Sequence, residues 1–236
     1  NSDDNYESFI NSSIATSVVE QSGASILQPK DIETFMKGKN FSISSYIEDY
    51  EQGFLISTDK KNLEIALEYM NYLIYEPKID KVIFDNTITE LRESVINKNN
   101  SPRAVYSDEI NKIYSGNHPR RNPLTLEDIQ LISPEKIMKE YKNKFDNFSK
   151  FNLVVVGSFE EKELENYLKK YIASLPSQED NSNVKPLNLN VPKNIIKKDV
   201  IKGVDKKATI TLIFPYNSQY GYEEKTLYNG FSQILD

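Results

Sequence analysis

The sequence predicts an α+β protein, with a mostly antiparallel sheet and helices packed on one face of it. Three observations lead to this class. Alternating apolar residues over 40–57 predict a β-hairpin, amphipathic segments between residues 63 and 114 predict helices, and residues 125–176 read helix, helix, strand and helix. A hairpin followed by helices and then by a strand–helix unit is typical of this class.

The first half of the chain is predicted to place the hairpin among helices. Apolar residues recur at helical spacing from Phe9 to Gln21, and Pro29–Lys37 has its proline where a helix tolerates it, in the first turn. Residues 41–47 alternate between apolar and polar, and Gly53–Ser57 supplies the second strand. Three further helices are predicted, over 63–76, 80–98 and 102–114.

The stretch Thr125–Pro176 is the most regular part of the sequence. After two helices, Phe151–Val156 is a short run of apolar and β-branched residues, which predicts a strand covered on both faces. Gly157 ends the run, and Ser158–Glu161 has the form of a capping box at the start of the next helix. That helix carries a single apolar stripe and is predicted over Glu160–Leu175.

The predicted organisation has three parts. Residues 1–176 form a first domain whose first strands are expected to be missing, because the polar start of the chain looks internal. Residues 177–192 are polar and punctuated by proline, as in a linker. Residues 193–236 are predicted to begin a second domain that is cut short, with strands over 194–202 and 208–214 and a helix from about Glu223. An incomplete domain would expose a strand edge, so we expect a homodimer or a domain swap through 193–236.

The composition excludes several classes of function. With 27% charged residues, 38% hydrophobic residues and a net charge of −6, the chain is an ordinary globular sequence and a poor candidate for nucleic-acid binding. It lacks an apolar run of about 18 residues, so no membrane span is predicted. It also lacks cysteine, which removes thiolate metal sites and cysteine nucleophiles.

Few residues qualify as candidates for chemistry. His118 is the single histidine, so neither H-x-x-E-H nor H-E-x-x-H can occur. No serine lies in a G-x-S-x-G elbow, and the turn at Gly157 lacks the further glycines and the lysine of a phosphate loop. No catalytic and no metal-binding residue is therefore predicted. His118, Arg120 and Arg121 form the one small basic cluster in a loop, which could bind a carboxylate but is explained more simply as a solvated turn.

Several motifs, taken in order, carry a family resemblance. They are His118–Ile129 (HPRRNPLTLEDI), Ser133–Ile137, Tyr141, Phe145, Asn152–Gly157 (NLVVVG), the helix Glu160–Leu175 with Pro176, and upstream Leu63–Pro77 with Phe84 and Asn100–Pro102. Together they resemble the pitrilysin/insulinase family of zinc peptidases, M16. The resemblance covers nearly the whole chain. It implies an M16 metallopeptidase-like (LuxS/MPP-like) sandwich.

The chain departs from this family at the residues that bind zinc. In active M16 domains the motif H-x-x-E-H lies on the first helix, whose counterpart here is Phe9–Gln21. That helix has Glu20 but no histidine, and the family's third ligand, a glutamate on a later helix, would fall near Glu93–Ser94. A lone glutamate cannot hold zinc. The resemblance therefore implies a non-catalytic domain, most like the third domain of a long, single-chain zinc peptidase.

The resemblance also implies the surroundings of such a domain. It would help to enclose peptide substrates, beside other M16 domains of a parent peptidase in which another domain holds the zinc. It would bind no zinc and have no activity by itself. The parent would act in a bacterial cell envelope (periplasm) or cytoplasm. The alternative is a non-peptidase binding or assembly module that shares this fold.

Overall fold

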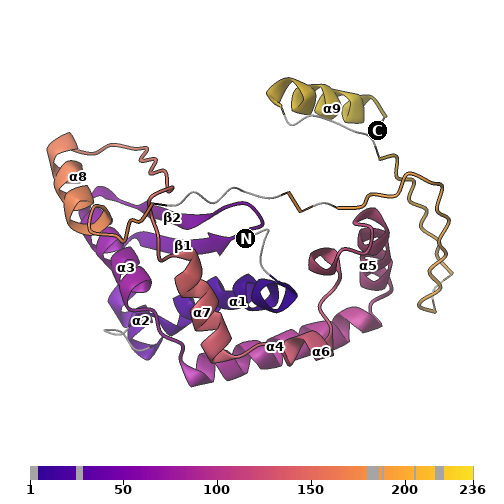
Figure 1. Cartoon of the computed structure of the whole chain (residues 1–236), viewed down its shortest axis with the longest axis horizontal. Coiled ribbons are helices and arrows are strands. Elements are labelled where there is room, and N and C mark those ends of the chain that lie inside the picture. Colours follow the sequence, from indigo (N-terminus) through magenta and orange to yellow (C-terminus); the bar gives the residue numbers. More distant parts are fainter. Residues whose placement is uncertain are drawn as a thin grey trace.

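The computed structural model of the 236-residue chain describes residues 5–24, 29–179, 186–187, 189–204, 206–215 and 221–235. Figure 1 shows a body of helices around one hairpin, joined by α4 to a second group of elements. The elements are α1 (Tyr6–Ser22), α2 (Pro29–Met36), β1 (Phe41–Ile47), β2 (Gln52–Thr58), η1 (Lys60–Asn62), α3 (Leu63–Tyr75), α4 (Lys81–Asn100), α5 (Pro102–Tyr114), η2 (Pro119–Arg121), α6 (Leu126–Ile129), α7 (Pro134–Lys144), α8 (Glu161–Tyr167), η3 (Leu168–Ile172) and α9 (Tyr222–Leu235).

The β-hairpin has one buried and one exposed face, as its alternating sequence predicts. β1 and β2 pair antiparallel, with Ile43 opposite Ile56 and Ser45 opposite Phe54 on the inner face. On the outer face Leu55 is 65% exposed. A Cβ at Gly53 would lie 2.7 Å from the hydroxyl of Tyr46, its partner across the ladder, so the Tyr46 ring packs over the glycine. Helices covering one face of an antiparallel sheet confirm the predicted α+β class.

The main hydrophobic core lies between this inner face and the helices α1, α3 and α7. Its fully buried members include Val18 of α1, Leu73 of α3 and Ile137 of α7. The rings of Phe54 on β2 and Phe145 after α7 lie 4.7 Å apart, centroid to centroid, which joins the sheet to α7. Aromatic pairs of this geometry add to the free energy gained by burial alone.

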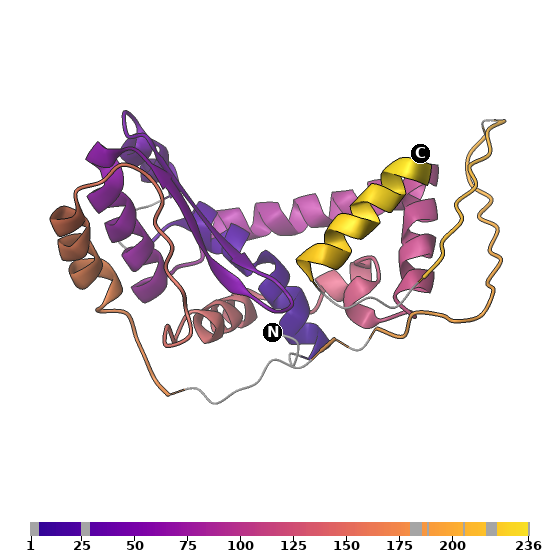
Figure 2. The same cartoon turned by 90° about the horizontal axis from the view of Figure 1, so that it is seen from above.

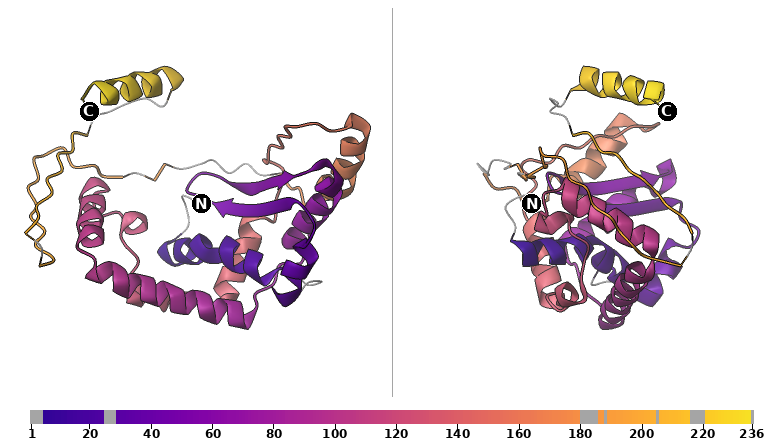
Figure 3. Two further views of the ribbon diagram at one scale, coloured as in Figure 1. Left: turned by 180° about the vertical axis from the view of Figure 1, so that it is seen from behind. Right: turned by 90° about the vertical axis from the view of Figure 1, so that its right-hand side faces the viewer.

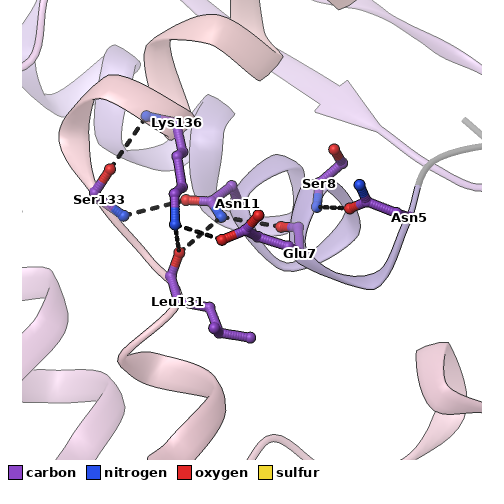
Figure 4. A network of polar contacts seen from close by, with 7 residues as sticks. All are labelled: Asn5, Glu7, Ser8, Asn11, Leu131, Ser133 and Lys136. Carbon is purple, nitrogen blue, oxygen red and sulfur yellow. Dashed lines mark hydrogen bonds and ion pairs between the residues drawn. The ribbon is translucent and has the colours of Figure 1, made fainter.

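α1 is also joined to the segment between α6 and α7 by a buried amide (Figure 4). Asn11 is 0% exposed. Its Nδ2 donates to the carbonyl oxygens of Glu7 (2.9 Å) and Leu131 (3.1 Å), and its Oδ1 accepts from the backbone N–H of Ser133 (3.2 Å). The side chain of Lys136 reaches Glu7 and the same Leu131 carbonyl. One amide thus satisfies the backbone groups of Leu131 and Ser133, which lie between α6 and α7.

Most helices begin at the residues that the sequence indicates. Asp80 caps α4 by accepting from the backbone N–H groups of its first turn, and Ser101 caps α5 directly before Pro102. Thr125 and Asp128 form a reciprocal capping box at α6. Local hydrogen bonds of this kind depend only on residues two or three positions apart, so the sequence determines them.

Two predictions around residue 157 are wrong. Residues 151–156 form no strand within the described part of the chain, and 152–156 are exposed: Val154 is 80% and Val156 is 91% exposed. A strand needs a partner edge, and no described segment lies in register beside this one. The capping box at Ser158–Glu161 is also absent, because α8 begins later, after Glu160, and no side chain accepts a hydrogen bond there.

The C-terminal region differs from its prediction as well. Residues 194–202 and 208–214 are not strands; they are extended and run along the outer side of α5, as Figures 1 and 3 show. Tyr106 of α5 donates to the hydroxyl of Thr211 at 2.7 Å, and Lys198 pairs with Glu109 at 3.3 Å. The predicted last helix is present as α9, which stands apart from the hairpin (Figures 1 and 2).

The extended C-terminal residues leave much apolar surface open. Ile201 is 97% and Phe214 is 80% exposed, and Leu227 on α9 is 68% exposed. A groove of about 1100 Å³ lies between α5 and residues 189–215. Of the predicted linker, Leu187 contacts the body through its N–H, which donates to the hydroxyl of Tyr50 at 2.8 Å. Over the described ranges, no helix is both long and apolar enough to cross a membrane.

Candidate functional site

The three candidate residues lie at the short helix η2, which connects α5 to α6. His118 is its N-cap, and its Nδ1 accepts a hydrogen bond from the backbone N–H of Arg120 at 3.3 Å. The imidazole therefore closes the turn through its Nδ1. Arg120 and Arg121 follow on η2 and both line a pocket, to which His118 does not contribute. The structure thus brings two of the three predicted residues together.

The pocket has a volume of about 380 Å³ and lies between three separate segments. η2 supplies the arginines, α1 supplies Phe9, Ser12 and Ser13, and the turn between β1 and β2 supplies residues 47–51. In Figure 1 this turn lies above α1. The pocket therefore lies where the turn between β1 and β2 packs on α1.

The inner wall of the pocket is formed by a buried charge cluster. The side chain of Arg120 is 5% exposed; its NH1 lies 3.9 Å from Oδ1 of Asp49 and its guanidinium lies 5.1 Å from the centre of the Phe9 ring. Arg121, 37% exposed at its side chain, hydrogen-bonds to the other carboxylate oxygen of Asp49. Two guanidinium groups thus contact one carboxylate, which ties η2 to the turn between β1 and β2.

Ser12 adds an unusual feature to this wall. It is 4% exposed, and its hydroxyl has no hydrogen-bond partner among the described residues. Buried hydroxyl groups nearly always have a partner, because an unpaired one loses its hydration without compensation. The sequence had no signal for Ser12, and none for Asp49 beyond its place in the acidic turn Glu48–Glu51.

The helix that carries zinc ligands in active M16 domains is arranged differently here. Glu20 of α1 accepts from both the backbone N–H and the hydroxyl of Ser45, the latter at 2.5 Å. Aligned on Glu20, the histidine positions of H-x-x-E-H are occupied by Ser17 and Gln21, which hydrogen-bond to each other at 3.0 Å. Glu93 is exposed on α4. These residues do not fit a zinc site, and the described part of the chain holds no group of three metal-ligating side chains.

Glu20 instead belongs to a polar group under the sheet. Burial and the nearby Glu20 carboxylate raise the pKa of Tyr69 and of the fully buried Tyr141. The hydroxyl of Tyr141 lies near Ser45 but has no hydrogen bond of normal geometry within the described residues. The carboxylate of Glu20 therefore joins α1 to β1 through its hydrogen bonds with Ser45. This is a structural role.

Comparison with known proteins agrees with these observations. Residues 132–235 match the family model described as the peptidase M16 inactive domain. No curated protein matches the sequence.

Among solved structures, the chain is similar to the periplasmic protease PqqL from Escherichia coli, with a TM-score of 0.66 and 15% identity over 77% of this chain and 20% of that one. It is also similar to the ferredoxin protease FusC, solved as a mutant in complex with Arabidopsis ferredoxin (TM-score 0.60, 16% identity, 75% of this chain and 20% of that one). A protease from Helicobacter pylori is a third relative in fold (TM-score 0.59, 17% identity, 81% of this chain and 46% of that one).

At these identities the structures establish the fold. The chain spans about a fifth of the length of the first two proteases and 46% of the third. The M16 resemblance predicted from the sequence is confirmed by the family match and by the fold together. The chain has the fold of M16-type proteases, and its residues 132–235 match the family model of the peptidase M16 inactive domain.

Proposed function

We propose that this chain is a non-catalytic domain that helps to enclose peptide substrates in an M16-type zinc peptidase, and that another domain of the parent protein holds the zinc. The proposal rests on the residues that α1 has at the positions of the zinc-binding motif. Its glutamate is engaged with Ser45, and Ser17 and Gln21 stand where two histidines would be needed. The match to the family's inactive domain supports the same function.

The first test uses the chain by itself. The purified 236-residue chain should contain no stoichiometric zinc and should not cleave an unstructured peptide, with or without added zinc. Metal content by mass spectrometry and cleavage of a quenched fluorescent peptide would measure both. Stoichiometric zinc or zinc-dependent cleavage would overturn the proposal.

The second test uses the parent protein. Its sequence should contain an H-x-x-E-H motif outside this segment, and substitution of that motif should abolish cleavage, while substitutions in α1 of this segment should not. A parent without such a motif would instead support the non-peptidase assembly module.

The proposed domain arrangement is a body over residues 1–176, a linker over 177–192 and the beginning of a further M16-like unit over 193–236. The exposed apolar residues of the last part support it, because such surface in a soluble protein normally faces a partner. In the parent this partner is another M16 domain. In the isolated chain we expect a homodimer through 193–236. Sedimentation would measure this, and a chain lacking 193–236 should then be monomeric.

A further inference from the structure

Helix α9 has an apolar stripe that is open to solvent. Leu227 and Phe231 lie one turn apart on the same face of the helix and are 68% and 59% exposed. Glu223, one turn before Leu227, extends this face with a carboxylate. Figures 1 and 2 show α9 standing apart from the hairpin. A helix of this kind gains most of its stability by packing its apolar face on another surface.

The groove beside α5 is a second open apolar surface of the same chain. Ile110 and Ile113 of α5 form one wall, and residues 189–215 form the other, where Leu212 is 75% and Phe214 is 80% exposed. The described residues that line the groove include none from α9. Two turns of a helix, about 11 Å long and 10 Å across, occupy roughly 850 Å³. The groove, at about 1100 Å³, is large enough for them.

The outer wall of the groove is held against α5 by specific contacts. The hydroxyl of Tyr106 donates to that of Thr211 at 2.7 Å. At the turn of this wall, Gly203 has a φ of +95°, and a Cβ there would lie 2.9 Å from Cγ of Pro102, so the turn packs closely on the start of α5. The groove is therefore a defined feature of the fold.

The charges of the two surfaces are complementary. The charged residues that line the groove are two lysines and one glutamate, namely Lys193, Lys198 and Glu109. The first turn of α9 has the opposite balance, with two glutamates and one lysine, namely Glu223, Glu224 and Lys225. An acidic helix start beside an apolar stripe thus fits an apolar groove that carries excess positive charge.

We propose that α9 of one copy of this chain inserts its stripe into the groove of a second copy, while the second copy's α9 fills the groove of the first. The single chain leaves both surfaces open, and a two-fold dimer closes both helix–groove pairs at once. Apolar residues one turn apart are the usual contacts of a helix bound in a groove. The inference rests on the domain arrangement proposed above, and it assigns the expected homodimer to two particular surfaces.

The first experiment measures the dimer dissociation constant of the 236-residue chain by sedimentation equilibrium. Leu227→Glu on the stripe and Leu212→Glu in the groove should each raise it about tenfold or more, because each places a charge in an apolar contact. Both side chains are largely exposed in the single chain, so the monomer should stay folded. Asn229→Glu is the matched control: it adds the same charge on the opposite face of α9 and should change nothing.

Mixing the two weakened variants tests whether the helix and the groove meet each other. A dimer of one Leu227→Glu copy and one Leu212→Glu copy keeps one intact helix–groove pair, whereas a dimer of either variant alone keeps none. The mixture should therefore dimerise more tightly than either variant by itself. If it does not, the two surfaces are not partners and the proposal is wrong.

An introduced disulfide identifies which copy fills the groove, since the chain has no cysteine of its own. A chain with Leu212→Cys and Phe231→Cys should form a covalent dimer on oxidation, as seen by electrophoresis without reductant. A covalently closed monomer would show that α9 fills its own groove and would overturn the proposal. A dimer that neither forms the disulfide nor responds to Leu227→Glu would also overturn it, yet would leave the homodimer through 193–236 standing. None of these results depends on zinc content or cleavage, so they are distinct from the tests of the proposed function.

Discussion

Asn11 should be the most important polar residue for the stability of this fold. Its side chain is fully buried and hydrogen-bonds to Leu131 and Ser133, more than a hundred residues away in the sequence. We consider the substitution Asn11→Leu, which keeps the approximate size of the side chain and removes its polar atoms. The expected cost can be derived from the backbone groups that lose their partner.

The N–H of Ser133 would lose its acceptor in a partly buried site, which costs about 1–3 kcal/mol. The carbonyl of Leu131 would lose one hydrogen bond but keep the one from Lys136 at 3.3 Å, so only the net value of a bond is lost there, about 1 kcal/mol. The carbonyl of Glu7 keeps its place in the helix. The total is a loss of about 2–4 kcal/mol, a large part of the stability of a typical domain.

Urea denaturation followed by far-UV circular dichroism would measure this loss. The midpoint should fall while the slope stays the same, because the folded structure and the surface exposed on unfolding are unchanged. Ser13→Ala on the same helix is the control, since its hydroxyl bonds only to its own helix, at the carbonyl of Ile10. A loss below about 0.5 kcal/mol for Asn11→Leu, or an equal loss for the control, would refute the reasoning.

Other predictions follow from single contacts. Burial raises the pKa of Tyr141 above its ordinary value of 10.0, so its neutral form stabilises the fold below that pH, and this contribution is lost as the pH rises through the folded-state pKa. Tyr141→Phe should therefore be within about 1 kcal/mol of the parent at neutral pH and should lose less stability in alkaline melts. Ser101→Ala, which removes the N-cap of α5, should cost about 1 kcal/mol in the same urea assay. Ile137→Ala should cost about 2–5 kcal/mol because that side chain is fully buried, whereas Val154→Ala should cost less than about 0.5 kcal/mol because it is 80% exposed; a large loss at Val154 would mean that residues 151–156 are covered after all.

The sequence by itself determined the local features of this protein. The hairpin follows from the alternation over 41–47, and the starts of α4 and α5 follow from Asp80 and from Ser101 before Pro102. It also determined an important functional absence, because a chain with one histidine cannot contain H-x-x-E-H. All of these depend on residue identity or on neighbours within a few positions.

The tertiary structure decided what depends on distant partners. The apolar run 151–156 was expected to be covered but is exposed, because apolar composition favours a strand without supplying the strand beside it. Asp49 meets Arg121 across 72 residues, and this contact, with Ser12, turns a basic loop into a pocket. Pairs so far apart leave no periodic trace in the sequence, since only the packing of the hairpin turn on α1 brings them together.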